Sequence, residues 1–303
     1  MGYLFLFLAL VAGGIKGFCG KKTSGAITLS SDSMVMNVLR MFLCVVIGFF
    51  LVLIEGDAHA FSIDSAFLWI ALLSGLSLAL FLVSWLLSVK SGAYMMVEIF
   101  MLVGVSVTVV LCRAFFNESV SLRQTFGMFL LFIAVYIMCT YNTSIKKKMK
   151  FSSLLLLILC GVSNGICDFS QKLFVKNCPS DSIAVFNLYT YLFAGAVLFF
   201  ASLVFRRLEK NSGEKLTNPF DIIKNIWIYV LIMAVCLFSY SFFKTKSAEY
   251  LDAILLYPLS QGFAMINSLF LSSVFFKEKI NLRCLVGIVL SFVALLFITF
   301  ESF

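Results

Sequence analysis

Long, uninterrupted apolar runs constrain this chain more than any other feature of its sequence. A bilayer core about 30 Å thick requires about 20 mostly apolar residues for a helix to cross it. Runs of that length recur along all 303 residues, and hydrophobic residues make up 62% of the chain. The runs are continuous and do not alternate at every second position, so they favour helices over the strands of a membrane barrel. The sequence therefore predicts an integral membrane protein built from α-helices.

Ten apolar runs are long enough to be transmembrane helices. They cover residues 2–20, 34–54, 65–88, 92–112, 124–141, 151–172, 183–205, 226–246, 250–273 and 282–300. The first run has no basic segment before it and no small-residue cleavage site after it, so we interpret it as a retained helix and not as a signal peptide. The connections are too short to contain a soluble domain. We therefore expect a multi-pass protein of the plasma (cytoplasmic) membrane.

A nine-residue pattern occurs twice, as FFNESVSLR from Phe115 and as FFKEKINLR from Phe275, a shift of 160 residues. Shorter matches lie in the same order along the chain. A glycine followed seven residues later by a lysine, for example, occurs as Gly14 with Lys21 and as Gly165 with Lys172. Several matches in one order indicate an internal duplication.

The duplication divides the chain into a first repeat, residues 1–145, and a second repeat, residues 146–303. Each holds five predicted helices, and five is an odd number, so the second repeat enters the membrane from the opposite side. The predicted fold class is an all-α polytopic membrane protein, with ten transmembrane helices as two inverted five-helix repeats in one membrane domain. Inverted repeats are typical of secondary transporters, in which two bundles rock about a central site.

Three features together resemble the drug/metabolite transporter superfamily, in its EamA-like ten-helix branch. They are the F-x-x-E-x-(V/I)-(S/N)-L-R-x-x-x-G pattern that opens helices five and ten, the G-x6-K pattern in helices one and six, and Arg40 early in helix two. The resemblance covers nearly the whole chain. It implies transport of small organic solutes such as amino acids, amines or other metabolites, often coupled to protons or to exchange. The chain departs from the family at Gly13, where an aromatic residue is common.

The repeated motif has a structural interpretation. Glu118 and Glu278 are near the start of helices five and ten, where a carboxylate can accept hydrogen bonds from unpaired backbone N–H groups. Ser121 and Asn281 are typical N-cap residues. We therefore expect a rigid turn before the last helix of each repeat. The Gly161-x-x-x-Gly165 pattern is expected to permit close approach of two helices.

Functional groups should be polar residues deep in the apolar runs, because an ionisable side chain there costs about 2.5 kcal/mol or more. Glu98 lies in the fourth predicted helix, with no basic residue one helical turn away on that helix. A desolvated carboxylate of this kind suits proton coupling, so we expect Glu98 to line the transport path. At the equivalent position of the second repeat stands Pro258, which would break or kink helix nine.

Asp168 and Lys172 are one turn apart in helix six. Two interpretations stay open, an ion pair that braces the helix and a substrate contact. The lysines near the membrane ends could also extend to the headgroup region. We expect Lys21, Arg40 and Lys172 to bind anionic groups or to lock helices together, and Tyr94, Tyr257 and Gln261 to form hydrogen bonds. The predicted substrate or coupling residues are Glu98, Asp168, Lys172, Lys21, Arg40, Tyr94, Tyr257 and Gln261.

The sequence does not favour an enzyme, a metal site or a cofactor. The nine cysteines are scattered singly and His59 is the single histidine, so neither a disulfide framework nor a zinc site is indicated. Metal- and phosphate-binding motifs such as D-D-x-x-D, H-E-x-x-H and a glycine-rich loop do not occur. The expected partners are a small-molecule substrate and the lipid bilayer, with a second copy of the chain in a homodimer; no nucleic acid is expected.

The primary hypothesis is a secondary transporter of a small organic metabolite that works by alternating access, with a cavity lined by helices one to four and six to nine. A non-transporting receptor or a lipid-translocating subunit of the same fold is the alternative, and a membrane-embedded transferase is a remote one. Two criteria disagree on the side of the membrane at which the termini lie. Lys and Arg are concentrated in the loops that follow odd-numbered helices, which predicts both termini outside, whereas the family arrangement places both termini inside.

Overall fold

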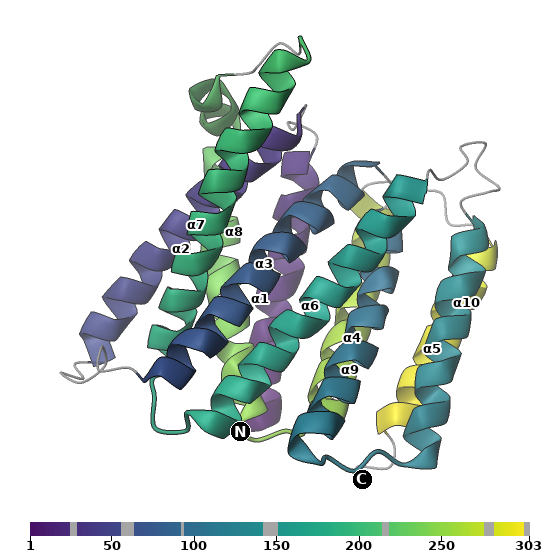
Figure 1. Ribbon diagram of the computed structural model, residues 1–303. Helices are drawn as coiled ribbons and strands as arrows, with labels where there is room; N and C mark the ends of the chain where they lie inside the picture. Colours follow the sequence, from purple (N-terminus) through teal and green to yellow (C-terminus); the bar gives the residue numbers. More distant parts are fainter. Residues whose placement is uncertain are drawn as a thin grey trace.

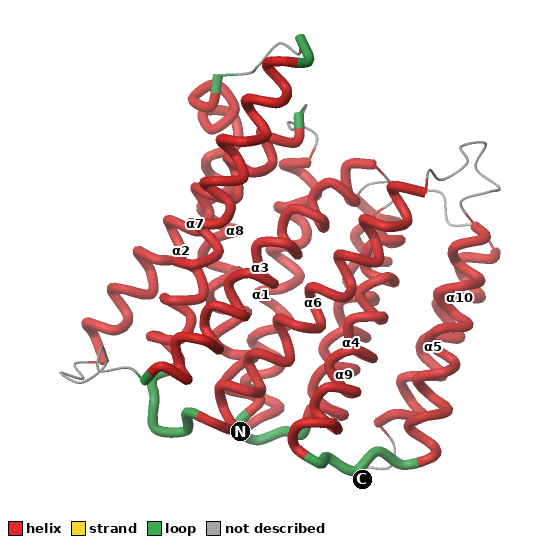
Figure 2. Tube along the Cα trace, in the orientation of Figure 1, coloured by secondary structure: helices red, strands yellow, loops and turns green. Residues whose placement is uncertain are grey.

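The computed structural model describes residues 1–24, 29–55, 64–91, 94–141, 151–213, 218–275 and 282–299, and these residues form an all-helical bundle. Figure 1 shows the helices as a ribbon, and Figure 2 shows how little of the described chain is loop. In chain order, the helices are α1 (Gly2–Ser24), α2 (Ser30–Glu55), α3 (Ser65–Ser91), α4 (Tyr94–Phe116), α5 (Leu122–Tyr141), α6 (Phe151–Asn177), α7 (Ile183–Asn211), α8 (Pro219–Ala248), α9 (Ala253–Phe270) and α10 (Leu282–Thr299).

The ten predicted helices are confirmed, and the fold class is polytopic and all-α. Within the described residues, seven helices are long and apolar enough to cross a membrane. Helices α4, α5 and α10 contain shorter apolar stretches, Phe100–Phe116, Leu122–Ala134 and Leu285–Thr299. Several helices extend beyond their apolar runs. Helix α8 begins at Pro219 instead of residue 226, because a helix does not have to end where its side chains become polar.

Large apolar side chains cover much of the outer surface. The side chain of Trp69 is 70% exposed and that of Leu122 is 91% exposed. A soluble protein rarely exposes so many large apolar groups, because their contact with water is unfavourable. Contact of the same groups with the hydrocarbon of a bilayer carries no such cost. This surface and the apolar helices show that the chain is a multi-pass integral membrane protein.

Each main helix pair joins the two predicted repeats. Helix α1 packs on α8, α3 on α6, α2 on α7, and α5 on α10. The α5–α10 pair lies at one edge of the molecule (Figure 1). Because every pair combines a helix from residues 1–145 with one from residues 146–303, the two segments interlock along their length. The inverted relation between the two segments stays a prediction.

Helices α4 and α6 approach until their backbones touch. A Cβ atom placed on Gly104 would overlap the carbonyl oxygen of Gly161, and one placed on Gly165 would overlap the carbonyl oxygen of Gly104. The hydroxyl of Thr108 lies 3.0 Å from the carbonyl oxygen of Gly104 and 2.9 Å from that of Gly165, so it bonds across the contact. The predicted role of Gly161 and Gly165 in close helix approach is confirmed.

The turn before α5 has the predicted capping residue. The Ser121 hydroxyl accepts from the Gln124 N–H at 3.2 Å, and the Gln124 side chain accepts from the Ser121 N–H at 2.9 Å. This reciprocal pair is a capping box. Glu118 does not bond to the start of α5 as expected. Its carboxylate accepts a hydrogen bond from the N–H of Ala253, the first residue of α9, at 3.3 Å. The equivalent residues Glu278 and Asn281 lie outside the described residues.

Helix α9 is continuous through Pro258, so the predicted break is absent. A proline has no N–H for the carbonyl four residues earlier, which leaves the Ile254 carbonyl without its usual intrahelical donor. One turn of π-helix, Leu271–Phe275, follows α9.

Candidate substrate cavity

A central cavity lies among seven helices that come from both halves of the chain. Helices α1, α3 and α4 line it together with α6, α7, α8 and α9, and its empty volume, including the open solvent at its edge, is about 920 Å³. The predicted contribution of α2 is wrong for the part of the chain that the structure describes, since no α2 residue lines the cavity there. The wall contains many hydrogen-bonding side chains, among them Ser74, Asn164, Gln171, Ser241, Gln261 and Asn267.

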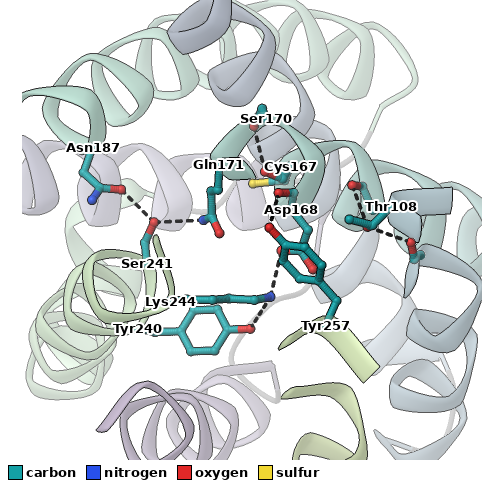
Figure 3. Close-up of polar contacts among 12 residues, drawn as sticks. Thr108, Cys167, Asp168, Ser170, Gln171, Asn187, Tyr240, Ser241, Lys244 and Tyr257 are labelled. Carbon is teal, nitrogen blue, oxygen red and sulfur yellow. Dashed lines mark hydrogen bonds and ion pairs between the residues drawn. The ribbon is translucent and has the colours of Figure 1, made fainter. Parts of the chain in front are cut away.

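Asp168, which lines the cavity, belongs to a buried ion pair. The Lys244 ammonium on α8 lies 2.7 Å from Asp168 Oδ1 on α6, and both side chains are almost fully buried. The same ammonium donates to the Tyr240 hydroxyl at 3.0 Å, and the Tyr257 hydroxyl donates to the backbone carbonyl of Asp168 at 2.7 Å (Figure 3). Buried charges are tolerated when they are paired and hydrogen-bonded. This network therefore holds α6, α8 and α9 together at the cavity.

Of the two interpretations of Asp168 and Lys172, the ion pair between them is wrong, since Asp168 pairs with Lys244. Lys172 donates to the carbonyl oxygens of Ala248 at 3.0 Å and Leu251 at 2.8 Å, and its ammonium lies 3.9 Å from Glu118. The last carbonyls of a helix have no intrahelical donor, and the C-terminal end of α8 supplies such acceptors to Lys172. Lys172 therefore clamps the α8–α9 turn and is not among the residues that line the cavity.

A second polar chain crosses three helices (Figure 3). The Gln171 amide on α6 donates to the Ser241 hydroxyl on α8 at 3.2 Å, and that hydroxyl donates to the Asn187 side-chain oxygen on α7 at 2.7 Å. Among the described residues, the Gln171 side-chain oxygen and the Asn187 side-chain nitrogen have no hydrogen-bond partner. Gln171 is one of the residues that line the cavity, and its side-chain oxygen is itself buried.

Helix α1 contributes a lysine and three glycines to the wall, among them Gly13 and Gly14. The Lys16 ammonium lies 4.3 Å from the centroid of the Tyr240 ring. A Cβ atom on Gly13 would lie 3.2 Å from that ring, and one on Gly14 would lie 3.0 Å from the Asn267 amide nitrogen. The absence of side chains at these two positions brings the ring and the amide against the α1 backbone. The ring of Tyr240 therefore occupies the space next to Gly13.

The structure distributes the predicted site residues over several environments. Asp168 and Gln261 line the cavity. Tyr257 is buried and reaches the cavity wall through its bond to Asp168. Lys21 lies in the last turn of α1 and is half-buried. Tyr94 and Glu98 belong to α4, but their side chains lie outside the described residues.

Arg40 is buried in α2 and does not line the cavity. Its side chain is only 2% exposed, and its Nε has no hydrogen-bond partner among the described residues.

Sequence reasoning missed Lys244 and Tyr240 and did not include Lys16 in the site. Lys244 lies close to the end of an apolar run, a position that also fits a lysine at the headgroup region. The four-residue spacing from Tyr240 to Lys244 was the available signal, since it places both side chains on one face of a helix.

Comparisons with known proteins agree with this architecture. Residues 151–300 match the model of the EamA-like transporter family. A search of curated protein sequences gives no match. A solved crystal structure superposes with a TM-score of 0.69 and 12% sequence identity, over 99% of this chain and 97% of the other; at that identity the likeness shows a shared fold alone. The family match shows that residues 151–300 belong to the EamA-like transporter family of the drug/metabolite transporter superfamily, whose members are membrane transporters of small molecules.

Proposed function

We propose that this protein is a secondary transporter that moves a small organic metabolite through the central cavity by alternating access. The cavity supports the proposal, because charged and amide side chains of α1, α6 and α9 meet there inside an apolar bundle. Polar groups at that depth are expensive in a membrane and commonly mark a transport path. In the proposed mechanism, residues 1–145 and residues 146–303 form two inverted repeats that rock about the cavity and expose it to each side in turn.

Flux through reconstituted protein tests this proposal. Proteoliposomes that contain the purified chain should show saturable uptake of a cargo found by a metabolite binding screen. Replacing cavity residues should reduce that uptake about tenfold or more; Gln261→Leu tests α9 and leaves the Asp168–Lys244 pair intact. Lys176→Met is the matched control, since Lys176 is exposed near the end of α6. Purified protein that binds the cargo and never moves it would identify a receptor instead and would overturn the transport proposal.

We also propose that Glu98 couples transport to protons. Glu98 precedes the cavity-lining Met101 by three residues on α4, so both lie on neighbouring parts of one helix face. Glu98→Gln should abolish the pH dependence of flux in proteoliposomes while leaving exchange of internal for external cargo intact. Flux that keeps its pH dependence in this variant would remove Glu98 from the coupling role and would favour obligatory exchange.

A further inference from the structure

A second hollow, which we call the α4–α5 groove, lies between α4 and α5. Its empty volume, including the open space at its mouth, is about 890 Å³. Seven of its nine lining residues are apolar and the other two carry hydroxyl groups. The nine are Val103, Ser106, Val107, Val110, Leu111, Thr125, Met128, Phe129 and Phe132. Among the described residues, none lines both this groove and the central cavity, so the groove is separate from the proposed transport path.

The groove forms because α5 packs mainly on α10, at the edge of the molecule, and leaves its other side toward α4 (Figure 1). On α4, Val103, Val107 and Val110 are four and three residues apart, so they lie along one face of the helix. The groove residues of α5 follow the same spacing. Both sets lie within the apolar stretches Phe100–Phe116 and Leu122–Ala134. The groove therefore faces the hydrocarbon of the bilayer.

A polar hollow adjoins the groove where α4 turns into α5. Its lining residues are Arg113, Asn117, Glu118, Ser119 and Val120. Arg113 follows Val110 of the groove by three residues, so the two are neighbours on the surface of α4, about 4.5 Å apart along the helix axis. Arg113 is exposed, and its guanidinium has no ion-pair partner among the described residues.

We propose that this place binds a phospholipid with a net negative headgroup, with one acyl chain in the α4–α5 groove and the phosphate at Arg113. An apolar groove followed by a polar hollow with a cation matches an acyl chain followed by a phosphate. A gap beside the helices would lose dispersion contacts, so in a bilayer a lipid chain fills the groove. A guanidinium binds phosphate oxygens through paired N–H donors. The proposal does not depend on the proposed transport function.

The other side chains of the polar hollow are compatible with a phosphate. Asn117 and Ser119 are exposed and supply neutral hydrogen-bonding groups. The Glu118 carboxylate is engaged by the protein, because it accepts from the N–H of Ala253 at 3.3 Å and lies 3.9 Å from the Lys172 ammonium. Only 13% of the Glu118 side chain is exposed. A zwitterionic headgroup would bring its own ammonium close to the exposed arginine, so phosphatidylglycerol should bind better than phosphatidylcholine.

Native mass spectrometry of the detergent-purified protein tests the site with phosphatidylglycerol, phosphatidylethanolamine and phosphatidylcholine of equal chain length. At one lipid per protein, phosphatidylglycerol should be retained about fivefold more than either zwitterionic lipid, the factor expected for one cation near a membrane surface. Arg113→Gln should remove this preference. Arg207→Gln, which changes an exposed arginine on α7, should leave it intact.

Filling the groove tests the place of the acyl chain in the same assay. Val110 is 59% exposed, so a larger side chain fits there without entering the helix bundle. Val110→Trp should reduce the retention of all three lipids about twofold or more, because the ring occupies the space of the chain. Val235→Trp is the matched control, since Val235 is 48% exposed on α8 and does not line the groove.

Quenching by brominated lipids gives a second measurement, in vesicles. Phe129→Trp, in a protein whose three native tryptophans are replaced by phenylalanine, places a single reporter in the groove. In equal mixtures of phosphatidylglycerol and phosphatidylcholine, bromination of the phosphatidylglycerol chains should quench this reporter about twofold or more above bromination of the phosphatidylcholine chains. Phe200→Trp in the same background gives the baseline for unselected lipid, because Phe200 is 66% exposed on α7.

Equal retention of the three lipids by the parent protein, or a preference that survives Arg113→Gln, would overturn the proposal. Reduced retention in Val110→Trp without any headgroup preference would identify a groove for acyl chains alone and would overturn it as well. If Arg113→Gln fails to fold, the two brominated lipids decide. Equal quenching of the groove reporter by both, or the same ratio at Phe200→Trp, would then contradict a specific site.

Discussion

The Lys244 ammonium lies 2.7 Å from the Asp168 carboxylate, and this contact joins α8 to α6 inside the helix bundle. The pair is buried on both sides, so each charge depends on the other. Tyr240 and Tyr257 add hydrogen bonds to the same group of residues. Removing one of the two charges would therefore leave the other buried without its partner.

Replacing Asp168 by asparagine should lower the free energy of unfolding by about 3 kcal/mol or more, because Lys244 would be left without its contact carboxylate. The double variant Asp168→Asn with Lys244→Met should recover most of this loss, since neither charge is then buried alone. Denaturant unfolding of the detergent-purified proteins measures both effects. A single variant as stable as the parent would show that the pair is not a coupled unit.

Replacing Lys172 by methionine should loosen the α8–α9 turn. Two backbone carbonyls, those of Ala248 and Leu251, would lose their donor. The expected loss is about 2 kcal/mol, the usual magnitude for buried polar groups left unpaired. Lys176→Met, one turn further along α6 and exposed, should change stability by less than about 0.5 kcal/mol. Similar losses in both variants would contradict a specific clamp.

Replacing Gly104 by alanine should separate α4 from α6. The added methyl group would overlap the backbone of Gly161, and overpacking of this kind destabilises by about 1–3 kcal/mol. Gly195→Ala is the milder comparison, since its Cβ would meet Met41 alone, at 3.3 Å. Thermal unfolding that leaves Gly104→Ala unchanged relative to the parent would mean that the helices can move apart without penalty.

Replacing Ser121 by alanine should weaken the start of α5 by about 1 kcal/mol, the usual effect of a lost N-cap side chain. Ser119→Ala is the control, because Ser119 is exposed two residues earlier and forms no part of the capping box. The two variants should differ in unfolding midpoint. Equal midpoints would show that the reciprocal bonds between Ser121 and Gln124 contribute little.

The helices could be predicted because few backbone conformations are stable inside a bilayer. Backbone N–H and C=O groups cannot remain unpaired in hydrocarbon, so a long apolar run must be a helix. The depth of a polar residue in such a run was also informative, since Asp168 and Gln261 both line the cavity. Helix ends were less predictable, because the polar residues that end an apolar run do not end the helix.

The partners of charged side chains could not be predicted from one sequence. Asp168 and Lys172 are one turn apart, and spacing along α6 pairs them equally well with each other. The structure pairs Asp168 with Lys244 and places Lys172 against the end of α8. Both choices depend on how α8 crosses α6, which involves residues far apart in the chain. Lys16 was similarly ambiguous, because its position in α1 fits the headgroup region as well as a cavity wall.

The bare backbone contact between α4 and α6 has a consequence for the width of the cavity. Gly161 and Gly165 stand on the helix that also presents Asn164 and Asp168 to the cavity. Any descendant of this sequence with a bulkier residue at Gly104, Gly161 or Gly165 must shift α6 and carry those two polar groups with it. Cargo size can therefore diverge through positions that no cargo ever touches.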